Sequence, residues 1–429
     1  MWRRGDGDDV AVDEVDGDLA SLLLKESVGA QAPGATKAFR KDPRRSAMSL
    51  RRLASTLLAA WLVTLGVAGC RTDQDQDFGS GSPSPTTIAP PAPDTTVTTP
   101  PLDLPPFLPL EGITTALQYG EFGDGFPLWQ ERVPGIEDVR VRSTADGTEQ
   151  PALWLAAGDQ RPAPLLVVLH SWSTAYMQHT NIPFGVWADR NGWAMVAPNF
   201  RGVNAGPQAT GSDLAVQDVI DAVDFAVAQG GVDRDRVFLI GYSGGGMMSL
   251  LVAGRHPDRF GGAVSWVPVY DLVDWYGYVR AHTPQAAYSE QIIASCGGDP
   301  TSTPEARQAC QHRSPAAHVH GAAEANVPVY IGHGVSDRIV PPDYGVRAFN
   351  DLAEPGDRLG EPVSEALRQN SVPEDLHGSV TAPTYFEAGD PEVFVSRASG
   401  PVTLVLFDGQ HDMVYNPGLA WAHRIAASP

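Results

Sequence analysis

The feature that most constrains the fold is a short apolar run that leads into a glycine-rich turn carrying a serine. Residues 237–240 read Val-Phe-Leu-Ile and predict a buried strand, and residues 247–256 predict a helix. Between them, residues 241–245 read Gly-Tyr-Ser-Gly-Gly, which is the G-x-S-x-G pattern in a strand–turn–helix setting. The glycines leave room for a tight turn, and the helix dipole favours an oxyanion beside the serine. We therefore predict that Ser243 is a nucleophile.

Two further predicted strands place the partners that such a serine needs, in the order serine, acid, histidine. Residues 327–331 form an apolar run that leads to Asp337, and residues 402–407 form another that leads to His411. Loops beyond the C-terminal ends of parallel strands are where open α/β sheets build their sites. In this arrangement Ser243 attacks an acyl carbon and His411 takes its proton. Asp337 then fixes the tautomer and the orientation of the imidazole.

Other ionisable residues in the same segments compete for these roles. Asp271 and Asp274 follow the predicted strand 263–267 and are the alternative acid. We expect His333 to be a structural residue beside the acid loop, and Asp412 to cap a helix or to lie on the surface. The remaining histidines lack metal-ligand spacing, and no predicted strand leads into a phosphate-binding loop. We therefore expect no metal and no organic cofactor.

Six segments of the chain together resemble the α/β-hydrolases, and most closely the catalytic domains of the prolyl oligopeptidase and dienelactone hydrolase type. They lie within roughly residues 160–425 and are 165–170, 197–202, 241–245, 313–315, 333–341 and 409–411. The resemblance implies an α/β fold with a mostly parallel, doubly wound sheet, helices on both faces and a cap insertion. It also implies a serine hydrolase that works through an acyl-enzyme intermediate without a cofactor.

The segment expected to supply the oxyanion hole departs from the pattern of this family. Many relatives carry His-Gly-Gly after the third strand, whereas residues 170–173 here read His-Ser-Trp-Ser. Backbone N–H groups bind the oxyanion, so other side chains are tolerated where the backbone geometry is kept. We predict that the N–H of Gly244 acts together with that of Trp172 or of Ser171. Trp172 would then also form a wall of the acyl pocket, with core packing as the alternative.

Two predicted insertions are the candidates for restricting the substrate. Residues 271–325 lie where hydrolases of this family carry caps, and residues 352–400 are loop-rich and would either rim the site or cover a sheet edge. Aromatic residues cluster in and around the first insertion and beside the nucleophile. The candidates for the pocket or lid, with ordinary core packing as the alternative, are Tyr242, Trp266, Tyr270, Trp275, Tyr276 and Tyr278.

The N-terminal part of the chain carries an export pattern. A basic start at residues 48–52 is followed by a 16-residue apolar run and by Val-Ala-Gly-Cys at 67–70, which resembles a bacterial lipobox. We predict a signal peptide over 48–70 with Cys70 lipidated, so that the protein is anchored on the outer face of the cell membrane. The run is shorter than the roughly 20 residues of a membrane span, which makes a transmembrane anchor the alternative.

The segments on either side of this signal are expected to lack a core. We predict that residues 1–47 are a non-native upstream extension and that Met48 is the true start, with a cytoplasmic tail as the alternative. Residues 71–106 are rich in Pro, Ser and Thr and predict a disordered linker. Residues 107–429 are long enough for one hydrolase domain, and the roughly 30 residues before its first strand are too few for the β-propeller of full-length prolyl oligopeptidases.

Charge and cysteine content limit the partners and the compartment. The chain has 30 Lys and Arg against 51 Asp and Glu, so it repels nucleic acid and anionic lipid headgroups, and membrane attachment would come from the lipid. Three cysteines occur. With Cys70 lipidated, we expect Cys296 and Cys310 to be bonded in an oxidising compartment, with two free thiols as the alternative.

The sequence leaves the substrate open. The resemblance is to a family named for peptidases, but many members of the superfamily cleave esters, and no segment here marks a site for a peptide amino terminus. We favour a carboxylic ester as the substrate, with a small or oligomeric peptide as the alternative. A non-catalytic, hydrolase-like surface binding protein is a further alternative, although such proteins usually lose a triad residue and this chain keeps all three.

Overall fold

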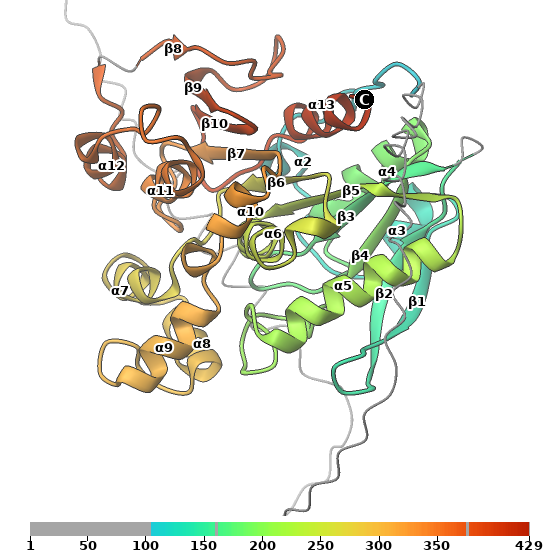
Figure 1. Cartoon of the computed structure of the whole chain (residues 1–429), viewed down its shortest axis with the longest axis horizontal. Coiled ribbons are helices and arrows are strands. Elements are labelled where there is room, and N and C mark those ends of the chain that lie inside the picture. Colours follow the sequence, from blue (N-terminus) through green and yellow to red (C-terminus); the bar gives the residue numbers. More distant parts are fainter. Residues whose placement is uncertain (1–103, 159–161, 375–376, 429) are drawn as a thin grey trace, which may run out of the picture. The chain divides into compact units, whose positions relative to one another are not determined.

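A ten-stranded sheet runs through the part of the chain that the computed structural model describes, residues 104–158, 162–374 and 377–428 (Figure 1). The strand order is β1-β2-β4-β3-β5-β6-β7-β10-β9-β8, and the six strands from β4 to β10 in this order are parallel. The strands are β1 Glu137–Arg142, β2 Glu149–Leu155, β3 Ala163–Leu169, β4 Ala194–Pro198, β5 Val232–Tyr242, β6 Gly262–Trp266, β7 Val329–Gly334, β8 Ser379–Val380, β9 Val393–Ser399 and β10 Val402–Phe407.

The central strands are apolar on both faces, because helices cover both sides of the sheet. In β3, Leu165 and Val167 pack into one hydrophobic core, and Leu166 and Val168 pack into the other. This alternation follows from the two-residue period of a strand. The near-continuous apolar runs that predicted buried strands in the sequence therefore correspond to strands in the middle of the sheet.

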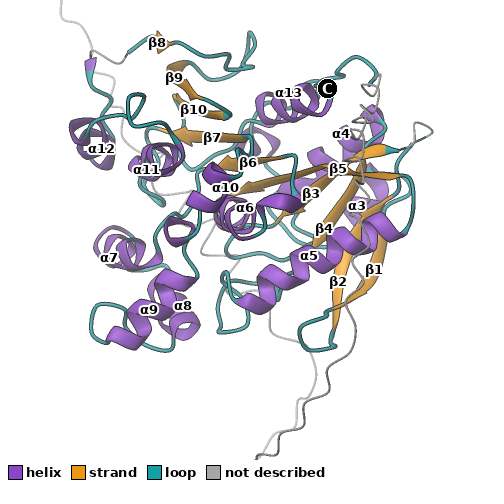
Figure 2. Cartoon of the chain, viewed as in Figure 1, coloured by secondary structure: helices purple, strands orange, loops and turns teal. Residues whose placement is uncertain are grey.

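The helices form one layer on each face of the sheet (Figure 2). The core on one face includes residues of α5, α6 and α11, and the core on the other includes residues of α3, α4 and α13. The helices are α2 Ala116–Tyr119, α3 Phe126–Arg132, α4 Ile182–Asn191, α5 Asp213–Ala228, α6 Gly244–Arg255, α7 Leu272–His282, α8 Tyr288–Cys296, α9 Pro304–His312, α10 His320–Glu324, α11 Asp343–Leu352, α12 Glu361–Arg368 and α13 Tyr415–Ala426. The predicted α/β fold, with a mostly parallel sheet and helices on both faces, is confirmed.

Residues 271–325 form a helical insertion after β6. It contains α7, α8, α9 and α10, and α7, α8 and α9 contact one another as a group (Figure 1). A disulfide with an S–S distance of 2.06 Å joins Cys296 at the end of α8 to Cys310 in α9. We refer to the group of α7, α8 and α9 as the cap.

The second insertion, residues 352–400, extends the sheet and does not form a lid. β9 pairs antiparallel with β10, and the short β8 pairs with β9, so the predicted His strand β10 is not at the sheet edge. The sequence missed β9, because Pro and Gly pairs before it indicated a loop and because its pattern of burial is irregular. Of the two roles predicted for this insertion, the structure supports the cover of an edge.

The predicted extension 1–47, the signal 48–70 with Cys70, and nearly all of the linker 71–106 lie outside the described residues. Within the described ranges, none of the helices combines the length and the apolar character that a membrane crossing requires.

Candidate active site

Ser243 lies on a strained turn between β5 and α6. Its φ of 59° is in the left-handed region, which a serine rarely adopts without a surrounding structure that enforces it. The turn is too tight for side chains on either side of it. A Cβ on Gly241 would lie 2.2 Å from the Gly245 carbonyl oxygen, and a Cβ on Gly245 would lie 2.2 Å from the Leu169 carbonyl oxygen. The two outer glycines of G-x-S-x-G are therefore required by close backbone approach, as the pattern predicted.

The structure brings Ser243, His411 and Asp337 into one hydrogen-bonded chain. The Ser243 Oγ lies 2.9 Å from His411 Nε2, and His411 Nδ1 lies 2.7 Å from Asp337 Oδ2. All three residues are buried, and they come from the loops after β5, β10 and β7. A carboxylate at Nδ1 fixes the proton there, which leaves Nε2 free to accept the serine proton. The geometry is that of a nucleophile, a general base and an orienting acid.

The Asp337 carboxylate is held in its ionised form by its neighbours. Its Oδ1 accepts hydrogen bonds from the backbone N–H groups of Ile339 at 2.8 Å and Val340 at 2.9 Å. Burial opposes ionisation, but the adjacent His411 and His333 outweigh it and hold the pKa of Asp337 well below its ordinary value. His333 lies behind this acid, with Nε2 3.4 Å from Oδ2, and does not touch the nucleophile. Its placement agrees with the predicted structural role.

The alternative acids take no part in this hydrogen-bonded chain and have other partners. Asp271 caps α7 by accepting from the N–H groups of Val273 and Asp274. Asp274 pairs with Arg347 at 2.8 Å and with Arg368 at 2.5 Å. Both carboxylates are thus used in the packing of α7 against α11 and α12.

Two backbone N–H groups lie beside the nucleophile, that of Gly244 at the start of α6 and that of Trp172 in the loop after β3. A Cβ on Gly244 would lie 2.6 Å from the Trp172 nitrogen, which shows how closely the backbones of these residues approach. Among the described residues, neither of these two N–H groups has a hydrogen-bond acceptor. The Ser171 N–H, by contrast, donates to Gln178 Oε1 at 2.8 Å. The alternative that placed Ser171 in the oxyanion hole is therefore corrected, because a committed donor is not available to an oxyanion.

A small pocket opens beside Ser243 and has a volume of about 40 Å³. Its walls come from the loop at 171–174, from Tyr242 under His411, from Tyr288 at the start of α8, and from Phe122 and Gly123 near the N-terminal end of the described chain. The Tyr242 hydroxyl donates to the His411 carbonyl oxygen at 2.9 Å, so this residue also supports the histidine loop. Among the described residues that line this pocket, there is no Asp, Glu, Lys or Arg.

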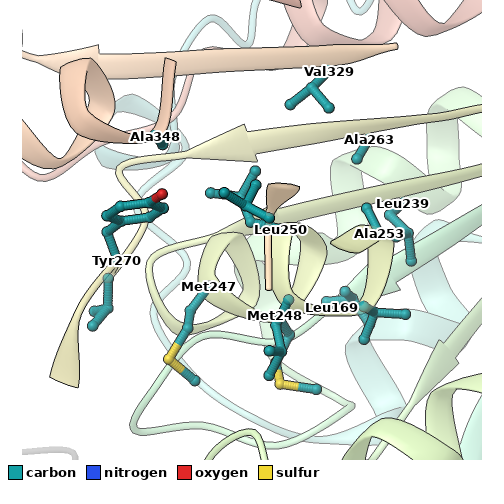
Figure 3. Packing of buried hydrophobic residues seen from close by; sticks show 14 of the residues in the cluster. Leu169, Leu239, Met247, Met248, Leu250, Ala253, Ala263, Tyr270, Val329 and Ala348 are labelled. Carbon is teal, nitrogen blue, oxygen red and sulfur yellow. The ribbon is translucent and has the colours of Figure 1, made fainter. Parts of the chain in front are cut away.

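Five aromatic residues that were candidates for the pocket belong to the core instead, and one of them, Tyr278, is buried in α7. Trp266 is buried below the turn, and Tyr270 packs near Ala348 of α11, as Figure 3 shows. Trp275 packs against Trp172 behind the pocket wall, and Tyr276 is buried in the packing of the cap. The sequence does not distinguish a pocket position from a core position for these residues, because the direction in which each side chain points depends on the element that carries it.

The sequence reasoning missed several residues that line this pocket, among them Phe122, Gly123, Gln178 and Tyr288. Gln178 belongs to no motif, and its role follows only from its contact with Ser171. Phe122 and Gly123 lie about 120 residues before the nucleophile. Their segment reaches the site because Thr115 pairs with Val414 and the Leu117 N–H donates to Asp412 Oδ1 at 3.1 Å.

Asp412 takes one of the two roles that were predicted for it, the capping of a helix. It is 5% exposed and lies next to His411, where its Oδ1 also accepts from the Met413 N–H at 2.8 Å. Burial raises the pKa of Asp412 to about 6. A surface position is thus wrong, whereas the capping of backbone N–H groups is what its carboxylate does.

Comparison with known proteins agrees with this geometry. A model of the prolyl oligopeptidase family matches residues 178–378, a range that contains Ser243 and Asp337. This part of the chain is a prolyl oligopeptidase family domain. The domain has the α/β-hydrolase fold.

Relatives of the domain include named peptidases. Dipeptidyl peptidase family member 6 of Caenorhabditis elegans is 29% identical over 185 residues, which are 41% of this chain and 24% of that protein. Acylamino-acid-releasing enzyme 2 of Oryza sativa subsp. japonica is 25% identical over 249 residues, which are 54% of this chain and 30% of that protein. Dipeptidyl aminopeptidase BIII of Pseudoxanthomonas mexicana is 30% identical over 184 residues, which are 41% of this chain and 26% of that protein. The chain thus matches about a quarter to a third of the length of these relatives.

Similar solved structures include the acylaminoacyl peptidase of Pyrococcus horikoshii. It has a TM-score of 0.41 and 19% identity, over 54% of this chain and 37% of that one. A puromycin-hydrolyzing peptidase of Mycobacterium tuberculosis has a TM-score of 0.39 and 20% identity, over 51% of this chain and 34% of that one.

Among the described residues, no cluster of His, Cys, Asp and Glu side chains could hold a metal ion.

Proposed function

We propose that this domain cleaves the bond between a small, uncharged acyl group and its leaving group through an acyl-Ser243 intermediate. The observation that carries the proposal is the hydrogen-bonded chain from Ser243 through His411 to Asp337, beside two unpaired backbone donors. Such a chain activates a serine, and the donors stabilise the oxyanion that its attack creates.

The reaction proceeds in two balanced halves. Ser243 Oγ bonds to the acyl carbon while its proton passes to His411 Nε2, and the N–H groups of Gly244 and Trp172 bind the oxyanion. His411 then gives this proton to the leaving oxygen or nitrogen as its bond to the acyl carbon breaks. In the second half, water attacks the acyl carbon and gives a proton to His411. The carboxylic acid leaves, and His411 returns the proton to Ser243.

The pocket favours a small acyl group without charge. Its volume of about 40 Å³ suits a group of a few heavy atoms, and its lining offers no carboxylate for the ammonium group of a free peptide terminus. We therefore place carboxylic esters first. N-blocked peptides are the second candidate, and the names of the acylamino-acid-releasing relatives favour them.

The test is a panel of kcat/KM values on the purified chain, with Ser243→Ala as the background. It sets short-chain and aromatic p-nitrophenyl esters beside N-acetylated and free aminoacyl anilides. Ester turnover without anilide cleavage supports an esterase. Efficient cleavage of N-acetylated anilides supports a peptidase for blocked peptides, and a preference for free amino termini contradicts the argument from the uncharged pocket. If no substrate exceeds the Ser243→Ala background, the proposed function is wrong.

The same proposal includes export and lipid anchoring at Cys70. The lipobox-like end of the apolar run supports it, and a disulfide between Cys296 and Cys310 fits an oxidising compartment. In a bacterial host fed an alkyne analogue of palmitate, the parent should be labelled and recovered with membranes, and Cys70→Ser should lose both properties. An unlabelled parent would contradict the anchoring.

A further inference from the structure

The side chain of Trp172 is held by the cap. Its indole Nε1–H donates to Gln291 Oε1 of α8 at 2.7 Å, and its ring packs edge-on against Trp275 of α7, with ring centroids 4.7 Å apart. Trp172 is also the residue whose backbone N–H faces the Gly244 backbone beside the nucleophile. The same residue therefore links the cap to the oxyanion hole.

A second connection reaches the backbone of Trp172 from the same helix. The Trp172 carbonyl oxygen accepts a hydrogen bond from the Asn204 N–H at 2.9 Å. Asn204 Oδ1 accepts in turn from the Thr210 N–H at 3.0 Å, and the Thr210 hydroxyl lies 2.8 Å from the Ser295 hydroxyl of α8. A shift of α8 would therefore reach both the side chain and the backbone of Trp172.

The end of α8 is itself fixed. The disulfide joins Cys296, its last residue, to Cys310 of α9. The Arg313 guanidinium just after α9 donates to the carbonyl oxygens of Ala209 at 2.9 Å and Pro207 at 2.8 Å. The cap is thus attached to the segment 204–210 that supports Trp172.

We propose that Gln291 is a positioning residue that holds the Trp172 backbone N–H in the oxyanion hole, so that the cap takes part in catalysis without touching the reacting atoms. The inference rests on the proposed function. An oxyanion donor works only within a few tenths of an ångström of its ideal distance, so a small rotation of the Trp172 peptide weakens it. Without the Gln291 acceptor, the buried indole N–H would lack a partner, and the ring would turn to find one.

The test is a double-mutant cycle of Gln291→Leu and Trp172→Phe, measured as kcat and KM on the best substrate of the panel. Gln291→Leu removes the acceptor, and Trp172→Phe removes the donor but keeps an aromatic ring against Trp275. Each change should lower kcat roughly 10-fold or more, with KM nearly unchanged. Deletion of an oxyanion donor lowers kcat ~100-fold or more, and the expected loss is smaller than that. The double variant should be no slower than Trp172→Phe alone, because the two changes remove one bond.

A second readout separates positioning from a general loosening of the structure. A trifluoromethyl ketone that forms a hemiketal with Ser243 places an oxyanion in the hole, so its affinity should fall in parallel with kcat. The matched control is Gln308→Leu, which makes the same change at an exposed site on α9 and should leave kcat and the affinity unchanged.

The outcomes distinguish the two proposals. If the parent turns over substrate and Gln291→Leu keeps both kcat and inhibitor affinity, the positioning role is wrong and the proposed function stands. If the parent does not exceed the Ser243→Ala background, the proposed function itself has failed. If Gln291→Leu fails to fold, Trp172→Phe tests the same hydrogen bond from its other end, and an unchanged kcat there overturns the role.

Discussion

Two buried carboxylates flank His411 and behave in opposite ways. Asp337, in the loop after β7, is fully buried, and its pKa lies well below the ordinary value. Asp412, in the loop after β10, is 5% exposed, and its pKa is raised to about 6. Burial alone therefore does not decide the direction in which the pKa of a carboxylate shifts in this site.

The partners of the two groups account for the difference. Asp337 faces two imidazoles and accepts from two backbone N–H groups on one oxygen, and these interactions outweigh its desolvation. Asp412 accepts mainly from backbone N–H groups and from the Thr115 hydroxyl, and its burial dominates. The first carboxylate is suited to orient a base, whereas the second ties the N-terminal segment to the histidine loop.

The largest expected effect is that of Asp337→Asn on turnover. An amide at this position accepts from or donates to Nδ1 without fixing its proton, so the imidazole loses the tautomer that accepts the serine proton. We expect kcat to fall about 10³- to 10⁴-fold with KM little changed. The measurement is steady-state kinetics on the best ester, with the exposed Asp408→Asn as the control. A loss under about 10-fold would show that another group orients His411.

A moderate effect is expected from Asp412→Asn, and it concerns stability. The pKa of Asp412 is higher in the folded state than in the unfolded state. The stability that its protonated form contributes is therefore fully present below about pH 4, and it is lost as the pH rises through about 6. The amide keeps an acceptor oxygen and carries no charge. We expect the variant to have a Tm a few degrees above the parent at pH 8 and the same Tm near pH 4.

Thermal unfolding followed by circular dichroism over this pH range checks that expectation, and kcat at pH 8 should stay within about threefold of the parent. A Tm difference that does not change with pH would contradict the assignment of a raised pKa to Asp412. A large loss of kcat would show that Asp412 takes part in catalysis. The contrast between a catalytic Asp337 and a structural Asp412 would then be wrong.

The smallest effect is expected from Thr115→Ala. Its hydroxyl supports the charged form of Asp412, so its loss should raise the pKa of Asp412 further, and it also removes the cap of α2. We expect a destabilisation of about 1 kcal/mol at pH 8 that becomes smaller at acidic pH. Thr115→Ser keeps the hydroxyl and serves as the control. The measurement is urea unfolding at pH 8 and pH 5, and equal losses at both values would leave only the helix cap as the explanation.

The sequence predicted the parts of the molecule whose pattern is local. Strands with near-continuous apolar runs, the turn at 241–245, and loops that follow strand ends gave the fold and the residues Ser243, Asp337 and His411, because parallel strands bring their C-terminal ends to one edge. It did not predict β9, whose partner is set by the neighbouring β10 and whose flanks indicate a loop.

Pairings between distant segments account for the errors in the site. The choice between Ser171 and Trp172 depended on Gln178, and the position of Asp412 depended on the segment 115–117. Neither contact leaves a periodic signal in the sequence, because side-chain hydrogen bonds between loops do not repeat along the chain.

By itself the sequence determined the strand–turn–helix that strains Ser243 and the order of the three reactive side chains, since these depend on backbone space and on strand direction. Only the tertiary structure decided which backbone N–H is free, which aromatic residues face the pocket, and in which direction the pKa of each buried carboxylate is shifted. Those properties depend on neighbouring residues that the fold brings together from distant parts of the chain. The pKa of a buried group in particular depends on all of its neighbours at once.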